Sequence, residues 1–322
     1  MTDDEQSRIA EGYRAFVREA AGESPAYSAL AAAVAEDRDV LRFLVTLPVG
    51  KRQPNLFLAS LRFLGGVPAD GVDLHERVRT DADRIRDTML ACATQTNEPA
   101  RCAALLPALA MVDGPLALIE VGTSAGLCLY PDRYSYEYDG RPVGSRRSVH
   151  LRCATSGAVP VPVEVPQVVA RIGIDLNPLD AADADDLAWL RALVWPGPAE
   201  ADRLHRLDAA AAVAAEEPPT LLAGDLVERL PAALALVPDG ATAVVLHTAV
   251  LPYLPAAHRT AFVEQVRELP VRWIAQEGAG MVPGTGERYP GGWGPYFVLS
   301  LDGRPLAHTA PHGGRIDWLP AG

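Results

Sequence analysis

The sequence is poor in lysine and carries an excess of acid. Lys51 is its only lysine, and 41 acidic residues against 29 basic ones give a formal net charge of −12. Nucleic-acid binding depends on cationic contacts to phosphates, so this balance disfavours DNA and RNA as partners. A small-molecule substrate fits the composition better.

Long apolar runs are also missing. No run reaches the roughly 18 residues of a membrane-spanning helix. The first residues, Met-Thr-Asp-Asp-Glu-Gln, show none of the basic and then apolar character of a secretory signal. We therefore expect a cytoplasmic protein without a membrane partner. The sequence leaves the oligomeric state open.

Cysteine is scarce and scattered. Four cysteines lie far apart, and no two form a Cys-x-x-Cys pair: Cys92, Cys102, Cys128 and Cys153. This spacing argues against a zinc site and against a disulfide framework. We expect reduced, mostly buried thiols and no metal.

The first 112 residues carry only helical patterns. Ile9, Tyr13, Phe16 and Val17 share one helical face, for example. No strand pattern precedes Leu116. We therefore expect a helical N-terminal region over residues 1–112, followed by a second domain over 113–322.

From residue 116 onward, apolar strands alternate with helices. Expected strands cover 116–121, 168–174, 220–223, 241–246 and 271–275, and residues 296–301 and 306–308 form a closing hairpin. Repeated strand–helix units predict an α/β fold, with a mostly parallel Rossmann-like sheet between layers of helices. Residues 130–166 interrupt the alternation. Their alternating tyrosines and the Asp139-Gly140 turn predict a β-rich insertion.

The stretch Leu-Ala-Leu-Ile-Glu-Val-Gly-Thr-Ser-Ala-Gly over 116–126 is the most informative motif. A buried strand ends here in an acid, and glycines at 122 and 126 permit a sharp turn. Later strands end near Asp175, Asp225 and His247. Because the carboxyl ends of parallel strands share one edge of the sheet, we expect these side chains to converge on one crevice.

This order of residues resembles the class I S-adenosylmethionine-dependent methyltransferases. An acid and a glycine turn follow the first strand, Asp175 the second, Gly224-Asp225 the third and a polar residue the fourth. More narrowly, the chain resembles an actinobacterial family of uncharacterised proteins assigned to that superfamily. The resemblance is carried by residues 95–98 (Gln-Thr-Asn-Glu), 120–127 and 173–180.

The resemblance implies S-adenosylmethionine as cofactor and a role for each matching position. The methionine end would be surrounded by Glu120, Gly122, Thr123, Ser124 and Gly126. Asp175 would accept hydrogen bonds from the ribose, Asp225 would accept one from the adenine amino group, and Leu226 would lie against the ring. Ser124 replaces the middle glycine of the family pattern, which requires a negative φ at this position.

Other polar residues are candidates for catalysis and substrate binding. A histidine titrates near neutral pH, so His247 is the candidate base, with Glu277 to orient or replace it. The candidates for substrate contact are Gln95, Asn97, Glu98, Arg101, Tyr289 and Trp293. Asn97 also suits a helix N-cap before Pro99.

Two other functions remain open. The chain could retain the methyltransferase fold as a non-catalytic or regulatory protein. Alternatively, Gly122-Thr-Ser124-Ala-Gly126 matches the Gly-x-Ser-x-Gly turn of serine hydrolases. Asp225 and His247, or a later histidine (His308 or His312), would then complete the triad.

Overall fold

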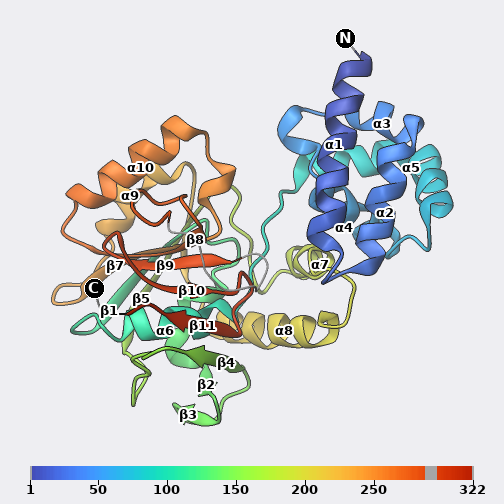
Figure 1. The fold of residues 1–322 in the computed structure, drawn as a ribbon. Coiled ribbons are helices and arrows are strands. Elements are labelled where there is room, and N and C mark those ends of the chain that lie inside the picture. Colours follow the sequence, from blue (N-terminus) through green and yellow to red (C-terminus); the bar gives the residue numbers. More distant parts are fainter. Residues whose placement is uncertain (1, 287–295, 321–322) are drawn as a thin grey trace. The chain divides into compact units, whose positions relative to one another are not determined.

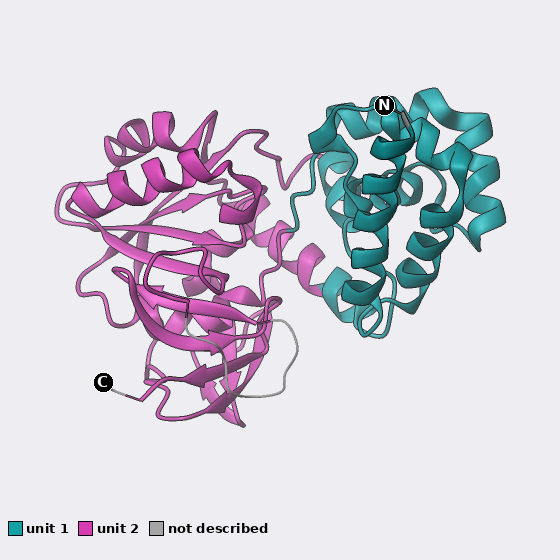
Figure 2. Cartoon of the chain, turned by 45° about the horizontal axis from the view of Figure 1, so that its top comes forward, with its two compact units in different colours: residues 1–96, 184–205 teal, residues 97–183, 206–322 magenta. Residues whose placement is uncertain are grey.

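The computed structural model describes residues 2–286 and 296–320. The chain divides into two compact units, each with its own core (Figure 2). We call residues 1–96 and 184–205 the helical unit, and residues 97–183 and 206–322 the sheet unit. Within the described residues, no helix is long and apolar enough to cross a membrane.

The helical unit is built from two separate stretches of chain. Its helices are α1 (Thr2–Ala20), α2 (Pro25–Glu36), α3 (Arg38–Val45), η1 (Val49–Lys51), α4 (Pro54–Gly65), α5 (Gly71–Ala91), α7 (Ala184–Ala192) and the start of α8 (Glu200–Glu216). Side-chain caps fix several starts. Ser24 accepts from Tyr27 N–H ahead of α2, and Asp70 accepts from Val72 and Asp73 N–H ahead of α5.

The second stretch completes the core of this unit. Trp195 packs edge-on against Phe16, with ring centroids 5.1 Å apart, and Trp189 packs in the same way against Phe63. Arg62 pairs with Glu200 at 2.7 Å. Without residues 184–205, the apolar faces that these tryptophans cover would be open to water.

The unit boundary therefore differs from the division expected at residue 112. Helix α6 (Arg101–Leu109) belongs to the sheet unit, and each of its residues is buried. It packs against strands β4, β8 and β9. A helix that is apolar on all sides is a buried helix, which explains why its sequence pattern did not reveal its partners.

The sheet unit is an α/β fold with a mixed, mostly parallel sheet. The strands are β1 (Leu116–Val121), β2 (Ser135–Tyr138), β3 (Arg141–Val143), β4 (His150–Ser156), β5 (Val168–Asp175), β6 (Thr220–Ala223), β7 (Thr242–Thr248), β8 (Arg272–Gly278), β9 (Phe297–Leu301), β10 (Arg304–Thr309) and β11 (Arg315–Trp318). The remaining helical segments are η2 (Leu127–Leu129), η3 (Pro131–Arg133), α9 (Leu226–Leu234), η4 (Leu251–Tyr253) and α10 (Ala256–Glu268).

The strand order is β3-β2-β4-β11-β10-β9-β8-β7-β1-β5-β6. The five strands from β8 to β6 in this order are all parallel, and β9 and β10 form the expected closing hairpin. From β1 the chain runs outward to β5 and β6, then returns to β7 on the other side. Helices α9 and α10 cover one face, and α6 lies on the other (Figure 1).

The insertion is β-rich, as expected, and joins the same sheet. Strand β2 pairs antiparallel with β3 and parallel with β4, which in turn pairs with β11. The hydroxyl of buried Tyr138 donates to Ala103 O at 2.6 Å. Pro107, four residues further along α6, has no N–H to offer that carbonyl. The tyrosine thus satisfies an acceptor that the proline leaves open.

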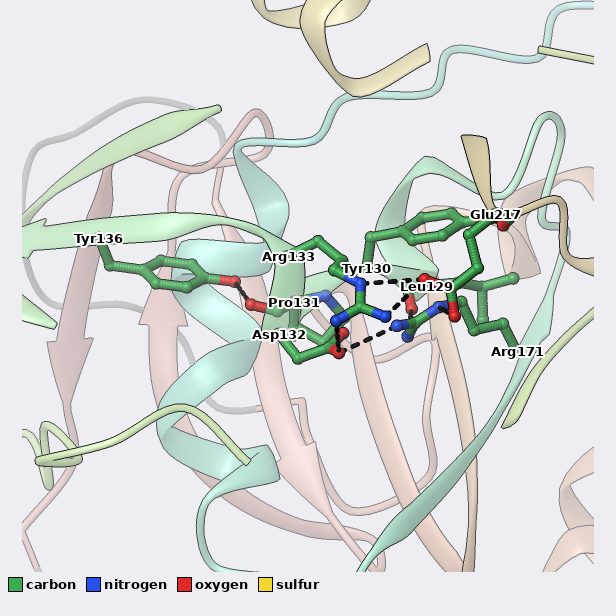
Figure 3. Close-up of polar contacts among 8 residues, drawn as sticks. All are labelled: Leu129, Tyr130, Pro131, Asp132, Arg133, Tyr136, Arg171 and Glu217. Atoms are coloured by element: carbon green, nitrogen blue, oxygen red, sulfur yellow. Dashed lines mark hydrogen bonds and ion pairs between the residues drawn. The ribbon is translucent and has the colours of Figure 1, made fainter. Parts of the chain in front are cut away.

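A buried cation anchors β5 to the segment after β1 (Figure 3). Arg171 is 7% exposed and bonds Asp132 at 2.9 Å and Leu129 O at 2.9 Å. Its guanidinium lies 4.7 Å from the ring centre of Tyr130. Nearby Arg133 pairs with Glu217 at 2.6 Å, but both of those side chains are about half exposed.

These two arginines allow a matched test of burial. Arg171→Met is expected to lower the free energy of unfolding by about 3–5 kcal/mol, because it leaves the buried Asp132 carboxylate with only the more distant Arg133, 3.6 Å away, as a cation. Arg133→Met is expected to cost about 0–1 kcal/mol, as for exposed ion pairs. Urea unfolding followed by circular dichroism measures both. Equal losses would contradict the assignment of Arg171 as the anchor.

Candidate functional site

The turn after β1 is conformationally unusual. Gly122, Ser124 and Gly126 all have positive φ, at 71°, 54° and 73°. The expectation of a negative φ at Ser124 is therefore wrong. Ala249, just beyond the neighbouring strand β7, has φ 56°. Non-glycine residues in this region are strained, and such strain gathers at functional sites.

Two polar side chains hold the turn in place. Asp175 Oδ2 accepts from Ser124 N–H at 2.8 Å, and Asp175 Oδ1 accepts from Asn177 N–H at 2.9 Å. Asn97 accepts from Leu127 N–H at 2.9 Å and donates to Thr123 O at 3.3 Å. Asn97 is thus a clamp on the turn. The expectation that it caps a helix is wrong, because α6 begins after Ala100 without a side-chain cap.

The glycines of the turn are required by packing within the protein. A Cβ at Gly122 would lie 2.3 Å from Val250 Cγ2, and one at Gly126 would lie 3.2 Å from both Leu129 and Pro219. Protein atoms already fill the space beside these glycines. Their presence alone therefore gives no evidence for a cofactor.

Glu120 is a buried acid at the end of β1. It is 1% exposed, and its Oε2 accepts from Thr123 Oγ1–H at 2.9 Å. Burial raises the pKa of the Glu120 carboxyl well above its ordinary range, and the nearby Cys128 thiol adds to this shift. Burial therefore favours the neutral form of this carboxyl.

The predicted residues do not converge on one face of the sheet. Residues paired across parallel strands share a face, and Val121 pairs with His247 while Glu120 pairs with Leu246. Val121 belongs to the core under α9 and α10. His247 therefore lies on the α9–α10 face, and Glu120 on the face covered by α6. Asp175 falls on the Glu120 side.

His247 and Glu277 form a fully buried pair. His247 Nδ1 lies 2.7 Å from Glu277 Oε1, and the Trp273 indole N–H donates to His247 Nε2 at 3.0 Å. Since Nε2 accepts, the ring proton sits on Nδ1. Glu277 Oε1 also accepts from the N–H groups of Val250 and Leu251, at the start of η4. As a base, His247 would first have to release one of these partners.

Asp225 and Leu226 have structural roles in this arrangement. Asp225 caps α9 by accepting from the N–H groups of Val227 and Glu228, and His258 Nε2 lies 3.2 Å from its other oxygen. Leu226 is 7% exposed and belongs to the core under the sheet.

The candidate substrate residues are dispersed. Glu98 is buried, accepts from Ala100 N–H and pairs with Arg206 at 3.1 Å. Arg101 is buried at the start of α6. Gln95 belongs to the helical unit. Tyr289 and Trp293 lie outside the described residues.

One polar residue of the site was missed. Gln276 pairs with Thr248 across β8 and β7 on the Glu120 face, and it donates to Thr309 Oγ1 at 2.8 Å. The one available signal was a run of polar residues, Gln276-Glu277, at the end of an apolar strand.

One comparison with known proteins gives a match. The family model described as "Uncharacterized protein conserved in bacteria (DUF2332)" matches residues 69–318. The match spans the sheet unit and the last part of the helical unit. No curated protein matches the chain.

The close contact at Gly122 generates a test of the turn. Gly122→Ala is expected to cost about 1–2 kcal/mol for the left-handed backbone and roughly 1–3 kcal/mol more for overlap with Val250. Gly140 has φ 82°, and no atom beyond its chain neighbours lies within 4 Å of the position a Cβ would take. Gly140→Ala should therefore show the backbone cost alone.

Introducing Gly122→Ala into a Val250→Ala background isolates the steric part by a double-mutant cycle. The cost of Gly122→Ala in thermal or urea unfolding should fall, because the Cγ2 contact at 2.3 Å is gone. It should stay above that of Gly140→Ala, because the Cβ of residue 250 remains 2.9 Å away. An unchanged cost in that background would refute the contact.

The raised pKa of Glu120 predicts a pH-dependent stability difference. Above the ordinary carboxyl pKa of 4.5, the unfolded chain releases the Glu120 proton while the folded protein keeps it. The free energy of unfolding therefore falls as pH rises toward the folded pKa. The Glu120→Gln variant carries no such group and does not lose stability in this way. The free energy of unfolding of the variant, relative to that of the wild type, should therefore increase with pH above about 4.5.

Thermal unfolding from pH 4 to pH 8 measures this difference, since each kcal/mol raises Tm by about 2–4 °C in a domain of this size. Glu264→Gln, on the exposed side of α10, controls for the loss of one acidic group. A difference between Glu120→Gln and wild type that does not change with pH would contradict the assignment.

Proposed function

We propose that this chain, which belongs to the DUF2332 family of bacterial proteins, binds S-adenosylmethionine in the sheet unit and transfers its methyl group to a small molecule. One observation carries the proposal: the Asp175 carboxylate at the end of β5 grips the strained turn at the end of β1 through Ser124 N–H. An acid, a tight turn and a second acid thus meet at the carboxyl edge of a parallel sheet.

The position of this arrangement supports a ligand site. The chain leaves β1 toward β5 on one side and later returns to β7 on the other. Open α/β sheets bind ligands at such a switch point, beyond the carboxyl ends of the strands. Ser124 and Ala249, two of the four described non-glycine residues with positive φ, follow the two strands β1 and β7.

The donor set fits part of the cofactor. Asp175 is half-buried, and its two oxygens accept from the N–H groups of Ser124 and Asn177 at the end of β5. It would hold ribose hydroxyls. Glu120 would receive the ammonium group of the methionine end, which would draw its carboxyl into the charged form. Asp225 Oδ1 accepts from the first N–H groups of α9, whereas Oδ2 lies next to His258. An adenine amino group would compete with His258 for Oδ2.

Bound S-adenosylmethionine would supply an electrophilic methyl group on its sulfonium. The remaining work is alignment of the acceptor and removal of a proton where the acceptor carries one. We assign proton handling to Glu277, because its Oε2 is buried and has no hydrogen-bond partner. His247 holds this carboxylate in place through Oε1.

The serine-hydrolase alternative has one supporting feature, the positive φ of Ser124. The triad of Ser124, Asp225 and His247 is not assembled, however. Asp225 contacts His258 and the start of α9, and His247 contacts Glu277 and Trp273. In addition, the short 3-10 turn η2 follows Ser124 in place of the α-helix that a nucleophile elbow requires.

Calorimetric titration with S-adenosylhomocysteine and S-adenosylmethionine tests the proposal. Asp175→Asn is expected to weaken binding about 10- to 100-fold, as for loss of a hydrogen bond to a charged group. Asp302→Asn is the matched control. Asp302 has φ 53° in the β9–β10 turn and accepts from Trp273 N–H at the opposite end of β8, and asparagine tolerates that backbone.

Absence of binding to the wild type would overturn the cofactor assignment. Equal weakening by Asp175→Asn and Asp302→Asn would remove Asp175 from the site. Binding without methyl transfer to any acceptor in a small-molecule screen would favour the non-catalytic alternative.

A further inference from the structure

Arg101 is a buried cation that forms no ion pair within the described part of the chain. Its side chain is 5% exposed, and among the described residues no Asp or Glu oxygen lies within 4.0 Å of its nitrogens. By contrast, buried Arg171 has Asp132 at 2.9 Å. A buried charge is costly unless it is paired, so the state of Arg101 calls for a separate explanation.

The hydrogen bonds of Arg101 orient it without neutralising it. Nε donates to Pro311 O at 2.9 Å, and Nη1 donates to Thr248 Oγ1 at 3.1 Å and to Thr248 O at 3.3 Å. These acceptors are uncharged. Nη2 donates no hydrogen bond to any residue that the structure describes. The guanidinium is therefore held in place by Nε and Nη1, and only its Nη2 N–H groups are still to be used.

The neighbouring carboxyl does not supply the missing charge. Glu120 lies on the same face of the sheet and is close enough to interact electrostatically with Arg101. Burial nevertheless keeps the Glu120 pKa well above its ordinary range, which makes this carboxyl a weak counter-ion. No ion pair within 4.0 Å joins it to Arg101.

A second unsatisfied group lies in the same cluster. Gln276 is fully buried; its Nε2 donates to Thr309 Oγ1, and its Oε1 has no partner. Gln276 pairs across the strands with Thr248, the residue that Arg101 bonds. The cluster therefore lacks both an anion, opposite Arg101, and a hydrogen-bond donor, opposite Gln276.

We propose that Arg101, Thr248 and Gln276 form a binding site for the carboxylate of an α-amino acid group, with Arg101 as the anchor and Gln276 Oε1 sharing with Glu120 the role of acceptor for the amino group. A guanidinium fork matches a carboxylate in shape and charge. Such a group occurs at the methionine end of the proposed cofactor and in amino-acid acceptors. The site stands independently of the proposed function if an acceptor carries the group.

The first experiment identifies the source of the carboxylate. Wild type, Arg101→Met and Arg101→Lys are titrated with S-adenosylhomocysteine and with 5′-methylthioadenosine, which lacks the amino-acid end. If the cofactor carries the group, Arg101→Met should weaken S-adenosylhomocysteine binding at least about 30-fold and leave 5′-methylthioadenosine unchanged. Arg101→Lys keeps the charge without the fork and should fall between them.

The second experiment covers the acceptor. Thermal stabilisation is measured with each of the common L-amino acids and with its methyl ester, which has no carboxylate. An amino acid that stabilises the wild type, while its ester and the Arg101→Met variant show no shift, would place the acceptor at this site. Arg133→Met controls for the loss of an arginine charge.

The outcomes separate this proposal from the proposed function. If neither nucleoside binds the wild type, the cofactor assignment fails, and the amino-acid series still tests Arg101. The proposal is overturned if no ligand shows an effect that depends on both its carboxylate and Arg101. It is also overturned if Arg101→Met unfolds while Arg101→Lys, folded, binds every probe as the wild type does, because Arg101 would then serve only structure.

Discussion

The geometry of the sheet unit depends on how the chain turns at the end of β1. Three residues of that turn adopt left-handed backbone, and segments far apart in sequence hold it there. Asn97 clamps it from the start of α6, and Asp175 grips it from the end of β5. Leu179 N–H donates to Ser124 O from beyond β5. The turn is thus the point at which α6, β1 and β5 are fixed to one another.

The two faces of the sheet divide the polar residues into groups with different properties. The α9–α10 face holds His247, Glu277 and Trp273 in a network that braces η4, in which Glu277 Oε2 has no partner. The other face carries Glu120, Arg101 and Gln276, whose hydrogen-bonding and charge requirements are incompletely met. A ligand can satisfy such requirements. The groups that we propose for ligand recognition therefore lie on the α6 face, and Glu277, proposed for proton handling, lies at the end of β8 on the other face.

The sequence predicted the alternation of strands and helices well, because buried parallel strands are continuous apolar runs bounded by turn residues. The insertion was predicted for a similar reason, since alternating tyrosines and Asp139-Gly140 are local signals. β11 was missed because Arg315–Trp318 is short and polar. The place of α6 was missed because a helix buried all round shows no amphipathic face.

For the candidate site, the sequence identified strand ends but could not assign them to faces. A shift of one residue in register moves a side chain to the opposite face of a sheet. At the ends of β1 and β7, Glu120 pairs with Leu246, so that His247 is offset from Glu120 by one residue. Glu120 and His247 were therefore expected together and lie apart. The positive φ of Ser124 was equally hidden, because contacts from Asp175 and Asn97 impose it over the intrinsic preference of serine.

The two-segment construction of the helical unit has a consequence for synthesis in the cell. Residues 1–96 leave the ribosome before residues 184–205, which supply Trp189, Trp195 and Glu200 to that unit. At about 5–20 residues per second, the delay is roughly 5–20 s. During this interval the nascent N-terminal helices expose the apolar surface that the tryptophans later cover. Chaperones that shield apolar segments of nascent chains would act on the helical unit during this interval.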